Sequence, residues 1–218
     1  MIRNFIDFFL HLDVHLGSVL QSYGSWCYLL FFIVIFAETG LVVTPFLPGD
    51  SLLFALGALA AGGSINVWWL YIILAIAAVL GDSANYAIGK YFGDIILKHQ
   101  GKWFLKKEHI DRTHQFYEKY GAKTIVIARF VPIVRTFAPF IAGDGKMTYA
   151  KFFSYNIIGG IAWITLFVFG GYLFGNVPVI KRNFTIVILA IIILSVLPVV
   201  YEVIRQKMQN QENDRQAK

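Results

Sequence analysis

The amino-acid sequence predicts an all-α polytopic membrane protein that is built as an inverted repeat with two opposed re-entrant helical hairpins. Three observations favour this fold class. Of the 218 residues, 57% are hydrophobic and only 15% are charged, whereas a soluble domain carries about 25% charge. Two apolar stretches are too short to cross a bilayer and contain Pro or Gly breaks. Finally, one phrase in the first stretch recurs in the second, 94 positions later.

Residues 1–25 are predicted to form an amphipathic helix that lies in the membrane interface. Phe5, Phe9, Leu12 and Leu16 follow one another at spacings of three and four, which places them on one helix face. A helix with one apolar and one polar face lies along a membrane surface more readily than it crosses the membrane.

The first repeat, residues 26–93, opens with two short apolar arms. The first arm ends at Glu38, and the second begins after Asp50. Each has about a dozen residues, and about 20 are needed to cross 30 Å of hydrocarbon. The chain between them contains the break residues Pro45, Pro48 and Gly49. We therefore predict a hairpin that enters and leaves on the same side, with its irregular tip covered by protein or water.

A long helix from about Asn66 completes the first repeat and carries polar residues within an apolar span. Asp82 and Asn85 are secondary site candidates, and Asp82 is equally well explained as a helix-packing group. Gly81, Asn85, Gly89 and Gly93 recur every four residues, which predicts a small-residue face for close helix packing.

The rest of the chain is predicted in four parts. Residues 94–123 form a basic cytoplasmic segment, 124–175 the second repeat, 184–204 a C-terminal transmembrane helix, and 205–218 a polar tail. Residues 90–123 contain eight Lys or Arg against four Asp or Glu. Because basic loops stay on the cytoplasmic side, the C-terminus is expected in the cytoplasm and the two repeats are expected to be inverted.

The second repeat contains the phrase that resembles the first hairpin. Residues 44–51 read Thr-Pro-Phe-Leu-Pro-Gly-Asp-Ser, and residues 138–145 read Ala-Pro-Phe-Ile-Ala-Gly-Asp-Gly. The expected breaks of the second hairpin are Pro132, Pro139 and Gly143. Broken apolar segments at matching positions of two halves indicate the binding site of a transporter.

Four charges lie inside the two hairpins: Glu38 and Asp50 in the first, Arg129 and Arg135 in the second. Each would cost about 2.5–3.5 kcal/mol if unpaired at the bilayer centre. Prolines lie between the members of each pair, so the backbone can bend and the groups can converge. We therefore predict a central polar site, and buried salt bridges that brace the hairpins are a compatible alternative.

The residue types at this site suggest two roles. The guanidinium groups of Arg129 and Arg135 can donate bidentate hydrogen bonds to phosphate oxygens, so they are the candidate phosphate-binding residues. A buried carboxylate takes up a proton more readily than an exposed one, so Glu38 and Asp50 are the candidate proton-coupling residues. The only cysteine is Cys27, and no metal site, cofactor or nucleic-acid partner is expected.

These residues carry a family resemblance. Glu38, Phe46-Leu-Pro-Gly-Asp50 and Ala128-Arg-Phe-Val-Pro-Ile-Val-Arg135-Thr-Phe-Ala-Pro resemble the DedA family of bacterial membrane proteins, which has the VTT (SNARE-associated Golgi) domain. The resemblance covers about residues 5–205. It implies a location in the bacterial inner membrane, two opposed re-entrant hairpins, and flipping or scrambling of phospholipids or, in some members, of undecaprenyl phosphate. It also implies dependence on the proton gradient, with the acidic pair at Glu38 and Asp50 and the arginine pair at Arg129 and Arg135.

The expected function is thus non-enzymatic transport of a lipid phosphate, with membrane lipids and protons as partners; self-association into a homo-oligomer is compatible with it. Three alternatives stay open. In a proton-coupled small-cation or drug antiporter, the acids alone would suffice. A membrane-bound lipid phosphatase would require a histidine near the arginines, and the sequence places none near either of them. A membrane-organising protein would transport nothing.

Overall fold

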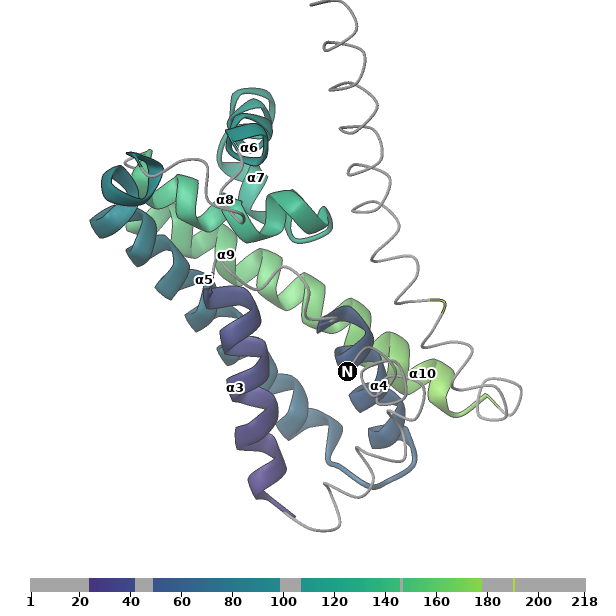
Figure 1. Ribbon diagram of the computed structural model, residues 1–218. Helices are drawn as coiled ribbons and strands as arrows, with labels where there is room; N and C mark the ends of the chain where they lie inside the picture. The colour runs from purple at the N-terminus through teal and green to yellow at the C-terminus, as the bar shows by residue number, and fades with distance from the viewer. Residues whose placement is uncertain (1–23, 42–48, 99–106, 146, 178–189, 191–218) are drawn as a thin grey trace, which may run out of the picture.

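The computed structural model describes residues 24–41, 49–98, 107–145, 147–177 and 190 (Figure 1). Every element in these ranges is helical, as predicted. The elements are α3 (Trp26–Gly40), α4 (Gly49–Ala61), α5 (Val67–Lys98), α6 (Lys107–Tyr120), η1 (Gly121–Lys123), α7 (Thr124–Ala128), α8 (Pro132–Asp144), α9 (Tyr149–Ile164), η2 (Thr165–Phe169) and α10 (Gly170–Gly175). The interfacial helix predicted for residues 1–25 falls almost entirely outside the described residues. The helix predicted for 184–204 and the polar tail of 205–218 also fall outside them, apart from residue 190.

Two helical segments are long and apolar enough to cross a membrane. They are Val67–Gly93 within α5 and Tyr149–Gly175, which joins α9, η2 and α10, and each has 27 residues. At 1.5 Å per residue each is about 40 Å long, against roughly 30 Å of hydrocarbon. The second segment contains a π-helical stretch, η2, a local widening that is often found at functional sites. Both segments were predicted as long apolar helices, and the helices are confirmed.

Helices α3 and α4 are apolar but short, with 15 and 13 residues. Neither reaches across 30 Å of hydrocarbon. Helix α3 packs mainly along α5, whereas α4 packs on α10 and η2. Gly49 begins α4, and Pro45 and Pro48 lie outside the described residues.

In the second repeat, α7 and α8 are separated by Arg129–Val131, and Pro132 begins α8. The break expected at Pro132 is therefore confirmed. The break expected at Pro139 is wrong, because this residue lies inside α8, whereas Gly143 lies next to the end of α8 at Asp144. A proline in a helix removes one backbone hydrogen bond, and packing of α8 along α5 maintains the helix regardless. Gly143 allows that packing, since a Cβ there would overlap the backbone carbonyl of Tyr86.

The small-residue face of α5 is confirmed by its contacts. A Cβ at Gly81 would overlap Thr39 of α3, and a Cβ at Gly89 or Gly93 would overlap Phe140 or Asp144 of α8. Small residues let helix backbones approach closely where lipid removes the hydrophobic driving force. This face therefore joins α5 to both α3 and α8.

The same arrangement occurs between α10 and α4. A Cβ at Gly171 would overlap the backbone of Phe54, just as one at Gly89 would overlap that of Phe140. A Cβ at Gly175 would overlap Ala58, just as one at Gly93 would overlap Asp144. A Cβ at Gly57 would overlap Val168, just as one at Gly143 would overlap Tyr86. The long-helix positions differ by 82 and the short-helix positions by 86 in all three comparisons. Helices α4 and α8 thus each pack on the long helix of the other half.

The shared Pro-Phe-x-x-Gly-Asp phrase does not follow this correspondence. Its Gly49 and Asp50 open α4, whereas its Gly143 and Asp144 close α8. The two copies, 94 positions apart, therefore occupy opposite ends of their helices. The phrase was a wrong guide to equivalent positions.

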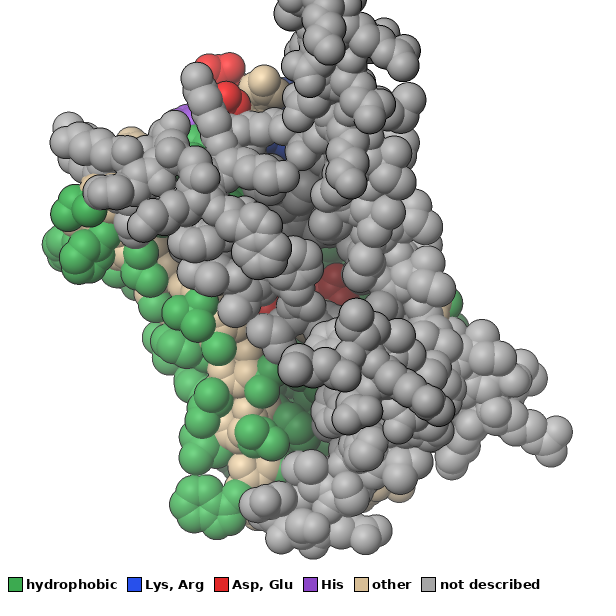
Figure 2. All heavy atoms as spheres, viewed as in Figure 1, with side chains coloured by type: hydrophobic (Ala, Val, Ile, Leu, Met, Phe, Trp, Pro, Cys, Tyr) green, Lys and Arg blue, Asp and Glu red, His purple; other side chains and the backbone are tan. Residues whose placement is uncertain are grey.

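One face of the molecule is apolar and exposed (Figure 2). On α5 the exposed side chains of Trp69, Ile72, Ile76 and Leu80 recur at spacings of three and four, which puts them on one helix face. Soluble monomers rarely expose so continuous an apolar strip. Lipid contact explains it.

Candidate functional site

Five charged side chains from separate helices converge in the interior of the described structure. Glu38 lies near the end of α3, Asp50 in the first turn of α4, and Asp82 in the middle of α5. Arg129 directly follows α7, and Arg135 lies in the first turns of α8. The acids of α3 and α4 therefore meet an arginine of α8, which is the convergence expected from the sequence.

Arg135 binds both acids of the first hairpin. Its Nη1 donates a hydrogen bond to Asp50 Oδ1 at 3.2 Å, and its Nη2 lies 3.3 Å from Glu38 Oε1. The side chains of Arg135 and Glu38 are 14% and 8% exposed, and that of Asp50 is 23% exposed. One guanidinium thus joins the end of α3 to the start of α4, and Asp50 is the member most accessible from outside.

Trp163 of α9 completes this half of the site. Its indole N–H donates to Asp50 Oδ1 at 2.8 Å, and its ring centroid lies 4.0 Å from the guanidinium carbon of Arg135. A cation over an indole face is attracted by the ring quadrupole. Trp163 is fully buried, so it fixes the positions of both charged groups.

Arg129 makes a separate ion pair. Its Nη2 donates to Asp82 Oδ2 at 2.6 Å and to Asn156 Oδ1 at 2.5 Å. The side chains of Arg129 and Asp82 are only 2% and 6% exposed. Glycines at 159 and 160 of α9 make room for the arginine, because a Cβ at either would come within 3.4 Å of its side chain. Surrounding protein atoms therefore exclude solvent from this ion pair.

Asn85 connects the helices around the cluster. Its Nδ2 donates to the backbone carbonyls of Thr39 in α3 at 3.2 Å and of Thr136 in α8 at 3.0 Å. Asn85 is fully buried. It therefore joins α3 and α8 to the long helix α5 beside the charged side chains.

Gly49 has a specific steric role at the site. A Cβ on this residue would overlap the carboxylate of Glu38. A side chain at position 49 would thus displace Glu38 from Arg135. The residue before Asp50 must accordingly be small for the two acids to share one arginine.

The charges and the polar atoms do not balance completely. Three carboxylates face two guanidinium groups, which leaves one net negative charge when all five groups are ionised. Within the described part of the chain, Glu38 Oε2, Arg135 Nη2 and Arg129 Nε and Nη1 are buried and accept or donate no hydrogen bond. Buried polar atoms of this kind ordinarily have a partner. The cluster thus has capacity for a proton and for further hydrogen-bond acceptors.

The ends of helices add to the electrostatics. Helices α4 and α8 each have 13 residues and begin next to the cluster. A helix N-terminus carries partial positive charge and exposes backbone N–H groups. Both ends favour an anion near Asp50 and Arg135.

Sequence reasoning missed Asn156 and Trp163. Asn156 is a polar residue in an otherwise apolar span, so the criterion that singled out Asn85 would also have found it. No comparable signal distinguishes Trp163 from the other tryptophans, because its role depends on its position beside Asp50. Among the described residues no group of three His, Cys, Asp or Glu side chains is placed to hold a metal ion.

This fold and site define a class of membrane protein. Its described part is helical, and ion pairs are buried between short and long apolar helices. A model of the VTT domain matches residues 47–173. The chain belongs to the DedA family of membrane proteins.

Three relatives illustrate the relationship. The chain is 51% identical to Protein DedA of Escherichia coli (strain K12) over 204 residues, which is 93% of each protein. It is 45% identical to an uncharacterized membrane protein of Mycobacterium tuberculosis (strain ATCC 25618 / H37Rv), over 76% of this chain and 74% of that protein. It is 33% identical to Inner membrane protein YqjA of Escherichia coli (strain K12), over 71% and 70%. No solved structure matches this chain.

Proposed function

We propose that this protein moves a phosphate-bearing lipid across the bacterial inner membrane and that proton uptake by Glu38 or Asp50 accompanies the movement. The substrate is a phospholipid or a polyprenyl phosphate such as undecaprenyl phosphate. The observation that carries the proposal is the double contact of Arg135 with the two carboxylates of the first hairpin.

The proposed exchange follows from charge balance. A lipid phosphate displaces one carboxylate from Arg135, and that carboxylate takes up a proton as it leaves. The site then never holds an unpaired buried cation, which would cost several kcal/mol. The guanidinium fork matches phosphate oxygens as well as carboxylate oxygens, and Asp50 is the partner that opens towards the outside of the cluster.

The proposed architecture is an inverted repeat in which α3–α4 and α7–α8 are re-entrant hairpins. The short lengths of α3 and α4 and the reciprocal glycine contacts at constant offsets support it. Transporters of this design bind substrates where half-helix N-termini meet near the bilayer midplane. The basic segment 94–123 supports a cytoplasmic C-terminus.

The test is lipid movement in vesicles that contain the purified full-length chain. A fluorescent phosphatidylglycerol reports translocation, and a polyprenyl phosphate is tested as competitor. We expect transport by the parent chain and almost none by Arg135→Lys, with Lys151→Gln, an exposed position on α9, as the control. Absence of lipid movement in the parent, with normal folding, would contradict the proposal.

The same vesicles separate the alternatives. Release of inorganic phosphate from the lipid would indicate a phosphatase. Proton movement driven by a cation or drug gradient without any lipid movement would indicate an antiporter. No translocation of any kind would leave a membrane-organising role.

A further inference from the structure

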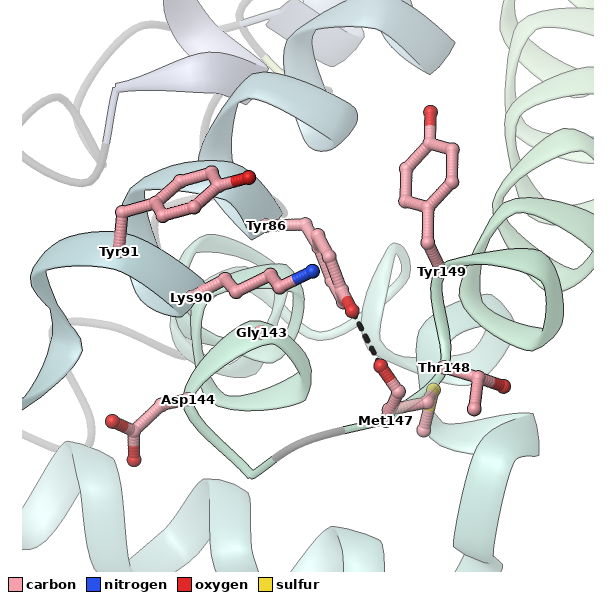
Figure 3. Close-up of a pocket in the computed structure, with 8 residues that line it drawn as sticks. All are labelled: Tyr86, Lys90, Tyr91, Gly143, Asp144, Met147, Thr148 and Tyr149. Carbon is pink, nitrogen blue, oxygen red and sulfur yellow. Dashed lines mark hydrogen bonds between the residues drawn. The ribbon is translucent and has the colours of Figure 1, made fainter.

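A pocket of roughly 470 Å³ opens where the end of α5 meets the link between α8 and α9 (Figure 3). Helix α5 contributes Tyr86, Lys90 and Tyr91 to its lining, the end of α8 contributes Asp144, and the chain that leads into α9 contributes Met147 and Tyr149. None of these residues takes part in the charge cluster. The pocket is therefore a second polar site.

The pocket lies at the ends of both membrane-spanning segments. Lys90 and Tyr91 are in the last turn of Val67–Gly93, and Tyr149 is the first residue of Tyr149–Gly175. Tyrosine is enriched at this level of a membrane, where an apolar ring and a wet hydroxyl are both satisfied. The pocket is accordingly at the height of lipid headgroups, at the end of α5 that leads into the basic segment 94–123.

Lys90 supplies an exposed positive charge to this pocket. Its ammonium group points towards the hydroxyl end of Tyr86 in Figure 3, whereas the carboxylate of Asp144 points away from it. The Asp144 carboxylate lies against Gly93 of α5. Among the side chains that the structure describes, no carboxylate forms an ion pair with Lys90. An anion beside Lys90 would therefore meet a cation that forms no ion pair with a described carboxylate.

The lining is held in place by its own contacts. The Tyr86 hydroxyl donates a short hydrogen bond to the backbone carbonyl of Met147. The Tyr86 ring lies 4.5 Å from that of Phe152 and 5.5 Å from that of Tyr149, centroid to centroid. A pocket that is already formed loses less entropy when a ligand binds.

We propose that this pocket binds the phosphate group of an anionic membrane lipid. Lysine binds phosphate as a point charge, and the hydroxyl of Tyr91, which also lines the pocket, can donate a further hydrogen bond. A volume of this size is typical of small-ligand sites. A free phosphate ion has the same chemistry as the headgroup, so the experiment includes both.

A polar row leads from this pocket towards the buried cluster. The Tyr149 hydroxyl donates to Ser83 Oγ at 3.4 Å, and Ser83 Oγ accepts from Asn156 Nδ2 at 3.5 Å. Asn156 in turn binds Arg129. The row reaches the cluster at the sealed Arg129–Asp82 pair, so it is a hydrogen-bonded link and no open path, and a lipid held at the pocket would wait beside the cluster. That waiting role rests on the proposed function, whereas lipid binding at Lys90 does not.

The experiment measures binding to the full-length chain in an uncharged detergent by thermophoresis. The probes are dihexanoyl phosphatidic acid, dihexanoyl phosphatidylcholine and inorganic phosphate. We expect phosphatidic acid to bind tightest and Lys90→Gln to weaken it about tenfold, as for a lost charge-assisted hydrogen bond. Lys151→Gln removes the same charge two residues from Tyr149, outside the pocket, and should change the affinity less than about twofold.

Equal losses in Lys90→Gln and Lys151→Gln would overturn the proposal, because the effect would be general charge attraction. Inorganic phosphate binding as tightly as phosphatidic acid would overturn the lipid assignment. The Arg135→Gln variant distinguishes this pocket from the central site. If lipid binding to the Arg135→Gln protein still depends on Lys90, the pocket proposal is supported even where transport is lost. If Arg135→Gln abolishes lipid binding and Lys90→Gln does not, the pocket proposal is overturned.

Discussion

The guanidinium carbon of Arg135 lies 4.0 Å from the ring centroid of Trp163. The same tryptophan donates its indole N–H to Asp50, which Arg135 also contacts. Trp163 therefore orients a cation through its face and an anion through its edge. It lies in α9, just before the π-helical stretch η2, so a change in that stretch would alter the orientation of both groups.

Trp163→Phe tests this double role. Phenylalanine keeps an aromatic face under Arg135 but removes the donor to Asp50, so we expect a loss of about 1–2 kcal/mol in stability. Trp163→Ala also loses the buried ring and should cost about 3–5 kcal/mol. Thermal unfolding in detergent measures both. Equal losses would show that the ring contributes nothing beyond the hydrogen bond to Asp50 and would contradict the double role.

The two arginines should respond differently to replacement by lysine. Arg129 is sealed against Asp82 and Asn156, and breaking such a buried pair costs about 3–5 kcal/mol. Lysine keeps the charge but not the planar fork, so Arg129→Lys should lose stability and transport together.

Arg135→Lys should retain most of its stability, because lysine can still pair with one carboxylate, but should lose transport of an anionic phospholipid. Unfolding temperature and vesicle transport are measured for both variants. Full transport with normal substrate affinity in Arg135→Lys would remove bidentate phosphate recognition from the mechanism.

Proton coupling is tested by neutral replacements. Glu38→Gln and Asp50→Asn keep the shape of each group but cannot release a proton. The variant that replaces the coupling acid should transport lipid at a rate that no longer changes with pH, while its folding is largely retained. Transport rates between pH 6 and pH 8 provide the measurement. A pH dependence like that of the parent in both variants would mean that neither acid carries the proton.

The close approach of α10 to α4 is tested by two neighbouring glycines. A Cβ at Gly171 would overlap the backbone of Phe54, whereas one at Gly170 would meet only a ring carbon of Phe54 at 4.0 Å. Gly171→Ala should therefore destabilise the protein by about 1–3 kcal/mol. Gly170→Ala should be neutral or stabilising by up to about 1 kcal/mol, through helix propensity. Equal changes in the thermal unfolding temperature of Gly171→Ala and Gly170→Ala would contradict this packing.

The sequence predicted the parts of the fold that depend on local pattern. Both long helices followed from continuous apolar runs, and the packing face of α5 followed from glycines spaced by four. The meeting of acids and bases followed from the cost of leaving charges unpaired in lipid. These inferences needed no knowledge of which helices are neighbours.

The pairing of the charges could not be predicted in the same way. The sequence suggests that Glu38 and Asp50 meet both arginines. In the structure Arg129 pairs with Asp82 of the long helix, and Arg135 contacts both Glu38 and Asp50. Which arginine meets which acid depends on how the short arms pack on the long helices. The helical conformation at Pro139 has the same origin, because tertiary packing along α5 overrides the local preference of proline.

The packing of α4 on α10, which belongs to the other half of the chain, affects the order of assembly during synthesis. Helix α4 is made early, but its packing partner α10 is more than a hundred residues further along the chain. At about 5–20 residues per second, α4 waits several seconds after leaving the ribosome. For the first part of that time Asp50 lacks both Arg135 and Trp163, which are made later in α8 and α9. The first half is therefore inserted before its final packing partner exists. The packing of α4 is completed only when α10 has been made.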